Sequence, residues 1–162
     1  MRLRRLVSLF AGLLAVTLSP LSARAADVEF VRVWPGWRDA ASFERISEYF
    51  TGREDTSGRT VLRTQPGMRD GFYFLVRVAN AAAAQPGAKF VLHVITPASP
   101  DPITHTFAAD LPARSTVFHL GLTGADWAGP DVHPVAWKLD LLTDTDQLLT
   151  SAQSYLWSKP AR

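Results

Sequence analysis

Residues 134–157, with the sequence PVAWKLDLLTDTDQLLTSAQSYLW, predict a β-hairpin. From Val135 to Leu142, apolar side chains at every second position alternate with the remaining residues, which is the two-residue period of a strand with one buried face. The polar residues 143–147 predict a turn, and a second, less regular run continues from Leu148 to Trp157. We expect the rest of the chain to pack against this hairpin.

Short apolar runs recur along the chain before the hairpin, at 28–34, 60–64, 72–79, 89–96, 103–107 and 115–120. Segments that contain proline and glycine separate them, and Pro35-Gly36 predicts a turn at the end of the first run. The three prolines between Thr96 and Ile103 cannot donate to a strand ladder, so they predict a loop at a sheet edge. Short strands at this spacing are typical of an antiparallel sandwich, and we expect a mainly β fold.

One helix is predicted, over residues 40–51, inserted after the first strand. Asp39 stands at the N-cap position, and Gly52 stands where a left-handed C-cap is favoured. Between them, apolar side chains recur at three- and four-residue spacing, at Phe43, Ile46, Tyr49 and Phe50. We expect this apolar stripe to lie against an edge or one end of the sandwich.

The final segment also resembles a known family. A strand that carries a tryptophan (Val135 to Leu139), a short polar turn and a closing strand that ends in aromatics (Tyr155 to Trp157) resemble the last hairpin of bacterial immunoglobulin-like or fibronectin III-like domains. This resemblance covers about the last quarter of the chain and implies an immunoglobulin-like sandwich. The segment 30–70, with its helix and arginine-rich loop, departs from the plain seven-strand pattern. The whole sequence is similar to exported bacterial proteins of unknown function, a resemblance that implies no catalytic residue.

Residues 1–25 have the features of a secretory signal peptide. Three arginines precede an apolar run that ends in Ser22-Ala23-Arg24-Ala25, and the small residues there suit a signal peptidase. The run is too short to span a bilayer as a helix. We therefore expect a periplasmic or secreted protein in which residues 26–162 form one domain with no membrane span. The chain has no cysteine, so its core must form without disulfides.

The charge balance excludes one class of partner. Four of the 17 basic residues and none of the 15 acidic ones lie in the signal segment, so the remaining chain is slightly acidic. Nucleic-acid binding then loses its main driving force, and we expect none. Eight arginines lie from Arg32 to Arg77 and eight acidic residues lie within 27–80. This composition favours either a partner surface or pairing of these charges with one another.

The sequence lacks a catalytic signature. It has no nucleophile elbow, phosphate-binding loop or dinucleotide fingerprint. Glu44 and Glu48 would share a helix face, as acid–base chemistry requires, but Arg45 and Arg53 are close enough to neutralise them. The preferred interpretation of this pair is a solvated helix face, and we expect no enzyme activity.

We expect no metal and no cofactor. The histidines, His93, His105, His119 and His133, are spaced more widely than metal ligands usually are. Two of them on neighbouring strands, completed by Asp101 or Asp131, are the alternative. Asp144 and Asp146 offer too few oxygen ligands for calcium and fit a hairpin turn.

The candidate binding surface is Trp34-Pro35-Gly36-Trp37-Arg38, joined by Trp127. A flat aromatic ring in a loop can stack on a sugar or on a proline of a peptide, or it can cap an open end of the core. The preferred hypothesis is a non-enzymatic, exported sandwich that binds a protein partner or a glycan through Trp34, Trp37, Arg38 and Trp127.

Two other functions stay open at this stage. The first is a hydrolase of envelope or extracellular polymers that uses Glu44 or Glu48 with an arginine or a histidine. The second is a chaperone-like or adhesin-like module that accepts a strand at the edge between Thr96 and Ile103. The sequence determines neither the ligand nor the oligomeric state.

Overall fold

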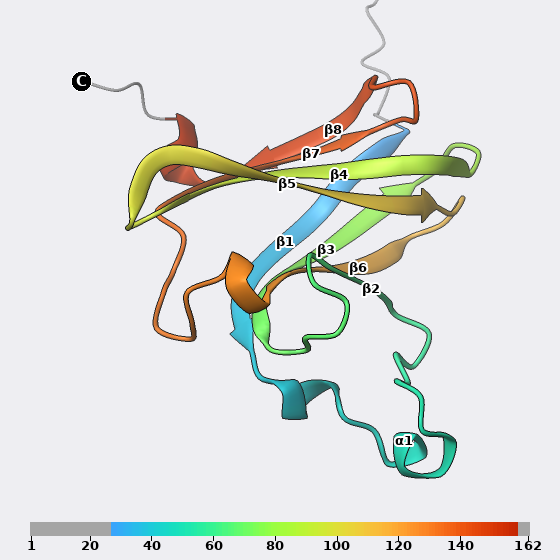
Figure 1. The fold of residues 1–162 in the computed structure, drawn as a ribbon. Helices are drawn as coiled ribbons and strands as arrows, with labels where there is room; N and C mark the ends of the chain where they lie inside the picture. The colour runs from blue at the N-terminus through green and yellow to red at the C-terminus, as the bar shows by residue number, and fades with distance from the viewer. Residues whose placement is uncertain (1–26, 159–162) are drawn as a thin grey trace, which may run out of the picture.

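The computed structural model describes residues 27–158, and these form two facing β-sheets (Figure 1). The first sheet contains, in spatial order, β1 (Val28–Arg38), β3 (Gly71–Asn80), β6 (Thr116–Thr123) and β2 (Thr60–Arg63). The second contains β5 (Ser99–Leu111), β4 (Gln85–Thr96), β7 (Ala136–Leu142) and β8 (Leu148–Gln153). Every pairing is antiparallel except that of β2 with β6. The predicted mainly β sandwich is confirmed. The predicted signal segment, 1–25, lies outside the described residues.

The strand order is of the immunoglobulin type. In chain order β1, β3 and β6 take the places of strands A, B and E in one sheet, and β4, β7 and β8 take those of C, F and G in the other. The non-consecutive neighbours β3–β6 and β4–β7 give the Greek-key connection of such sandwiches. Two features depart from the constant-type pattern: β5 pairs with β4, and β2 adds a parallel edge beside β6.

The core lies between the sheets. The side chains of Phe74, Leu92, Leu120 and Leu139 have no exposed surface, and Phe90 packs on Phe118 with ring centroids 4.9 Å apart. In the final hairpin, Leu139 and Leu141 are fully buried and Trp137 packs against the core, edge-on to Phe74. The hairpin therefore faces the other sheet, as its alternation predicts.

Proline does not end strands in two places where the sequence predicts that it does. β1 continues through Pro35-Gly36 to Arg38, because it is an edge strand and an edge tolerates a residue without an amide donor. β4 and β5 join through Pro97-Ala98 alone, so Pro100 and Pro102 lie within β5, which is also an edge strand. The predicted turn and the predicted proline-rich loop are both wrong.

Two further boundaries differ. β6 runs to Thr123, beyond the end of the predicted strand at residue 120. β8 ends at Gln153, and Tyr155–Ser158 form a 3₁₀ helix instead of the end of the closing strand. The Ser154 amide donates to the Trp137 carbonyl (2.9 Å), and the Ser154 hydroxyl accepts from the Trp137 amide (3.0 Å), so the chain leaves the ladder at this residue.

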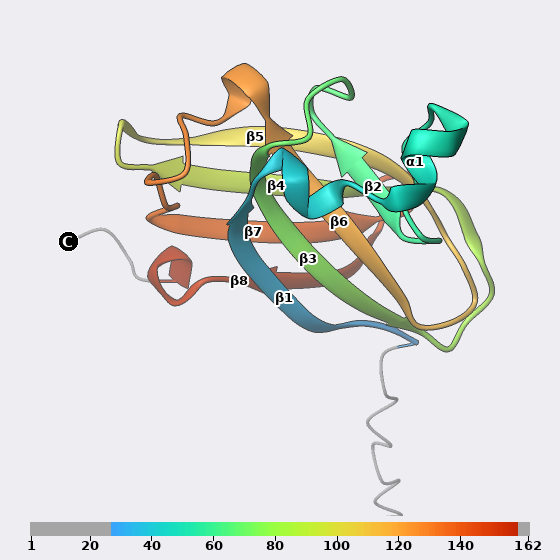
Figure 2. The ribbon, with the colours of Figure 1, turned by 90° about the horizontal axis from the view of Figure 1, so that it is seen from below.

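The predicted helix over 40–51 is two short helices. The 3₁₀ helix η1 (Ala40–Phe43) and helix α1 (Ile46–Thr51) are separated by extended backbone at Glu44 and Arg45. The Asp39 cap on the Ser42 amide and the left-handed Gly52 (φ 64°) agree with the sequence prediction. Both views place α1 beyond the outer face of the first sheet (Figures 1 and 2). No helix among residues 27–158 is long and apolar enough to cross a membrane.

Candidate functional site

The 39–59 segment is fixed to the first sheet by an ion-pair network of Glu48, Glu54, Arg63 and Arg69. Arg63, on β2, donates from Nη1 and Nη2 to the two carboxylate oxygens of Glu54, at 2.7 and 2.6 Å. The guanidinium also lies 5.0 Å from the ring centroid of Phe43, and the Arg63 side chain is only 6% exposed. A bidentate, shielded pair of this kind restrains both partners in position and in orientation.

Tyr73, on the outer face of the first sheet, joins the two arginines of this network through its hydroxyl group. Arg63 Nε donates to the Tyr73 hydroxyl (2.8 Å), which in turn donates to the Arg69 carbonyl (2.7 Å). The ring is fully buried on the outer face of β3 because Phe43 covers it at 4.8 Å. Gly121 stands opposite Tyr73 in the ladder, and a Cβ there would collide with the ring. Burial raises the pKa of the Tyr73 hydroxyl, so it stays a donor.

Helix α1 is held by a second contact. Arg69 Nη1 donates to Glu48 Oε2 at 2.7 Å, and Glu48 Oε1 accepts from the Asp55 amide at 3.1 Å. The Asp55 carboxylate accepts from the Ser47 hydroxyl and from the Ser57 amide. These hydrogen bonds lower the pKa values of Glu48 and Asp55, and the bond from Arg63 lowers that of Glu54. The network is therefore formed at neutral pH.

His119 lies beneath the same segment. Its side chain is 5% exposed, and its Nδ1 has no hydrogen-bond partner among residues 27–158. Burial, together with the positive charges of Arg38, Arg59 and Arg63, lowers its pKa to about 4. The imidazole is thus neutral at physiological pH, and acidification would place a charge beside three arginines.

The outward face of α1 carries three large apolar side chains with almost no contact to the sandwich. Ile46 is 80% exposed, Tyr49 is 89% exposed and Phe50 is 85% exposed. We call these three residues the α1 face. Beside it is a cavity of about 260 Å³ lined by Glu44, Arg45, Glu48, Tyr49 and Arg69. The predicted packing of the apolar stripe is wrong for these residues and holds only for Phe43, because the break at Glu44 and Arg45 turns α1 away from the sheet.

The four predicted site residues do not form one surface. Trp34 is 37% exposed on the outer face of β1, under the guanidinium of Arg32 at 4.7 Å. Trp37 packs against the core. Trp127 is 8% exposed and stacks on Phe72 at 4.6 Å. The alternative, in which the rings cap the core, therefore describes Trp37 and Trp127.

Arg38 is half-buried at the end of β1, where its charge acts on His119. Arg38 therefore belongs neither to the exposed surface around Trp34 nor to the core rings of Trp37 and Trp127. That these residues bind a ligand stays a prediction. If they do, they bind at more than one place.

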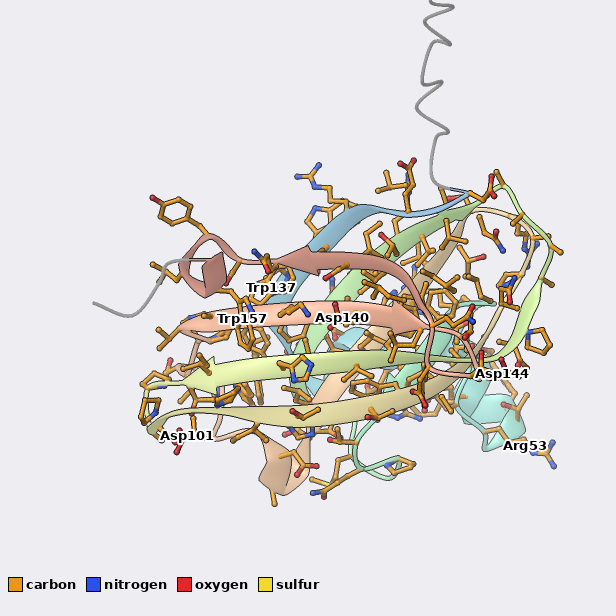
Figure 3. The ribbon with its side chains drawn as sticks, turned by 90° about the horizontal axis from the view of Figure 1, so that it is seen from above. Arg53, Asp101, Trp137, Asp140, Asp144 and Trp157 are labelled. Carbon is orange, nitrogen blue, oxygen red and sulfur yellow. The ribbon has the colours of Figure 1, made fainter. Side chains whose placement is uncertain are left out.

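The carboxylate pair of the hydrolase hypothesis is not arranged as the sequence predicts. Glu44 lies in the extended break and Glu48 on α1, so they do not share a helix face. Glu48 is paired with Arg69, and not with Arg45 or Arg53, the two arginines that are close to it in the sequence. Arg53 points away from the sandwich (Figure 3).

The histidines are dispersed. His93, on the outer face of the second sheet, contacts the Thr104 hydroxyl through Nδ1 (2.8 Å), and its Nε2 is 3.9 Å from Asp140. Asp140 lies midway along β7 (Figure 3) and accepts from Lys138 and Ser151. The serine thus bonds to the carboxylate and not to the imidazole, which is not the order that activates a nucleophile. Within the described part of the chain no three metal-ligating side chains form a group.

Asp144 and Asp146 lie in the turn of the last hairpin. Asp146 adopts a left-handed conformation (φ 65°), and its amide donates to the Thr143 carbonyl. Its carboxylate pairs with Lys89 at 2.6 Å. Asp144 lies in the same turn (Figure 3).

No protein-family model and no curated protein matches the chain. Among solved structures, an immunoglobulin-like protein from Pseudomonas aeruginosa is similar at 15% sequence identity, over 78% of this chain and 93% of that chain, with a TM-score of 0.29. A TM-score this low does not establish that the two proteins share a fold. The assignment of an immunoglobulin-like sandwich rests on the strand order described above.

Proposed function

We propose that the chain is an exported, non-enzymatic sandwich that binds a partner protein through the α1 face. The observation that carries this proposal is the exposure of Ile46, Tyr49 and Phe50, at 80 to 89%, on one six-residue helix. Single exposed apolar residues are normal on a protein surface, but a cluster of large ones marks an interaction site. Export is the expectation from residues 1–25 and is part of the proposal.

The ion-pair network holds α1 in place before any partner binds, so the α1 face is preorganised. Arg69 pairs with Glu48, which precedes the C-cap of α1, and Arg63 pairs with Glu54, which follows it. Because the helix is already fixed, a partner would not have to order it on binding, which removes part of the entropic cost of association.

The shape of the surface indicates a concave partner. A stable interface buries about 800 Å² on each partner, which a helix of under two turns cannot provide against a flat surface. A groove that surrounds the helix can reach this size, as in other complexes where an amphipathic helix enters an apolar groove. A second copy of this chain docked through the α1 face alone would bury too little.

The charges near the helix indicate the rim of that groove. Residues 39–59 contain five acidic residues and three arginines. Arg63 and Arg69 pair with two of these carboxylates, so the segment together with these two arginines has no net charge. The preference for a basic residue on the partner's rim therefore rests on a carboxylate outside the network. Glu44, which is exposed beside Tyr49, is the acidic residue best placed to contact such a rim.

The test is capture of an envelope protein by the immobilised chain without residues 1–25. We expect capture to be lost in the double variant Tyr49→Ser/Phe50→Ser and weakened in Glu44→Lys. It should persist in Leu148→Ser, the matched control, because Leu148 is a single exposed apolar residue (60%) on β8.

Capture that survives the double variant would contradict the proposal. Release of the captured protein by soluble glycans would also contradict it, because that result would show that the chain recognises a sugar and not a protein surface. Melting curves of all variants should overlay that of the parent, because none of these residues is part of the core.

A further inference from the structure

We propose that the open end of the sandwich is a second, independent site, which binds a small apolar molecule that carries no negative charge. The site is a cavity of about 310 Å³ between the β4–β5 turn and the loop that follows β6. No residue of the 39–59 segment lines it, so this inference does not depend on the proposed function.

The walls of the cavity are almost entirely apolar. Pro97, Ala98 and Ile103 form one side, and Ala125, Ala128 and Val132 form the other around Trp127. The alanines leave space that larger side chains would fill. A closed apolar cavity of about 150 Å³ binds benzene, and ligand pockets begin at about 300 Å³, so this volume suits a molecule of about two fused rings.

Trp127 contributes its ring to the wall of the cavity. The ring is 8% exposed and is held against Phe72 by a near-parallel stack (29° between planes). Its Nε1 is buried and has no acceptor within residues 27–158. That nitrogen is too deeply buried for an atom in the cavity to reach, so Trp127 offers a ligand an apolar ring surface.

Asp126 determines the charge that the cavity accepts. It is the charged member of the lining, it is exposed at the rim, and no basic side chain lines the cavity with it in the described chain. Its negative charge also acts on His105, where burial nevertheless lowers the histidine pKa and keeps that ring neutral. A carboxylate at the rim attracts amines and repels carboxylates, so free fatty acids are disfavoured.

The experiment uses three probes with one ring system and three charges: 2-naphthylmethylamine, 2-naphthalenemethanol and 2-naphthoate. Each is titrated into the ¹⁵N-labelled chain while the indole N–H signals are followed by NMR. We expect the amine and the alcohol to shift the Trp127 signal saturably, and the carboxylate to bind about fivefold more weakly than the amine, which is the size of one exposed charge interaction.

Three variants make the test specific. Ala128→Leu fills the cavity and should abolish the shifts, whereas Ala84→Leu, at an exposed loop position outside the cavity, should not change them. Asp126→Asn should remove the fivefold preference for the amine. Tyr49→Ser/Phe50→Ser should leave all three titrations unchanged, which separates this site from the α1 face.

Shifts that do not saturate, or that persist in Ala128→Leu, would overturn the proposed site. Equal affinity for the amine and the carboxylate in the parent chain would overturn the charge assignment and with it the proposal as stated. Loss of capture by the α1 face with these titrations intact, or the reverse result, shows which of the two proposals has failed.

Discussion

The sandwich and the 39–59 segment are held by different forces. Inside the sandwich, side chains such as Phe74 and Leu139 are completely buried, and packing is apolar. In the 39–59 segment, neither of the two described helices buries a residue, and the contacts to the sheet are ion pairs, hydrogen bonds and the single ring of Phe43. Segments with few buried apolar contacts open with less free energy than the core does. The molecule thus combines a rigid support with a segment whose position depends on charge.

The largest effect should come from the core. Phe74→Ala removes a ring with no exposed surface that packs edge-on to Trp137, and it should lower the free energy of unfolding by about 3 to 5 kcal/mol. Urea unfolding followed by circular dichroism measures this loss. Ile46→Ala, on α1, is the control and should cost under about 0.5 kcal/mol. Equal losses for the two variants would remove the distinction between the regions.

Gly121→Ala should cost about 2 to 3 kcal/mol, since the new methyl group must displace the Tyr73 ring or bend β6. Displacement of Tyr73 would also loosen Arg63 and Arg69, which its hydroxyl joins. We therefore expect faster amide hydrogen exchange in the 39–59 segment as well as a lower melting temperature. A lower melting temperature with unchanged exchange in that segment would show that Tyr73 does not transmit the change.

Glu54→Gln should cost about 1.5 to 2 kcal/mol, because it leaves the nearly buried guanidinium of Arg63 without its anionic partner. The local effect should exceed the global one. Trypsin should cleave after Arg45 and Arg53 faster than in the parent, while the core strands keep their exchange protection. Glu44→Gln is the matched control, since Glu44 lies outside the network. Equal cleavage rates for Glu54→Gln and the parent would disprove the role of the ion pair.

Acidification should release the 39–59 segment in two stages. The buried His119 has a pKa of about 4 in the folded chain and about 6.5 when unfolded. As the pH falls through this window, the unfolded chain takes up a proton that the folded chain does not, so stability decreases. Glu48, Glu54 and Asp55 have lowered pKa values, so their contribution is present above their unfolded values and is lost as the pH falls through their folded ones.

The measurement is the melting temperature and the hydrogen exchange of the 39–59 segment between pH 7 and pH 3. Both should show stability falling with pH. His119→Phe should flatten the upper part of this dependence, and Glu48→Gln/Glu54→Gln should flatten the lower part. A melting temperature that rises on acidification would contradict the assigned signs.

The smallest effect on stability should come from the α1 face. Tyr49→Ser/Phe50→Ser should change the free energy of unfolding by under about 0.5 kcal/mol, because these side chains are more than four-fifths exposed. Thermal melting checks this expectation. A loss of several kcal/mol would mean that α1 packs on the sandwich in solution, and it would remove the basis of the proposed function.

The sheet pattern was predictable because period-two alternation reports burial directly. Leu139 and Leu141 of β7 are buried at the positions that the alternation predicts, whereas Val135, before the strand begins, is 45% exposed. Strand ends were predicted less well. Pro35 and Pro100 are compatible with a strand only when that strand is at a sheet edge, and the order of strands in a sheet cannot be read from the local sequence. For the same reason, the sequence could not show that Trp34 faces outward while Trp37 faces the core.

The candidate site was harder to predict. The sequence shows a three- and four-residue apolar repeat, which is usually a sign of packing, and it shows as many arginines as carboxylates between Asp27 and Asn80. It does not show that Arg63 selects Glu54 or that Arg69 selects Glu48. These pairs are brought together by β2, by the turn before β3 and by the break at Glu44.

The amino-acid sequence by itself determined the fold class, the thiol-free core and the caps at Asp39 and Gly52, because alternation, composition and capping depend on residues that are neighbours in the chain. Tertiary structure alone decided which aromatic rings are core and which are surface, which charges pair, and where cavities are left. Those outcomes depend on contacts between segments far apart in sequence, such as β2 with β6 and Trp127 with Phe72.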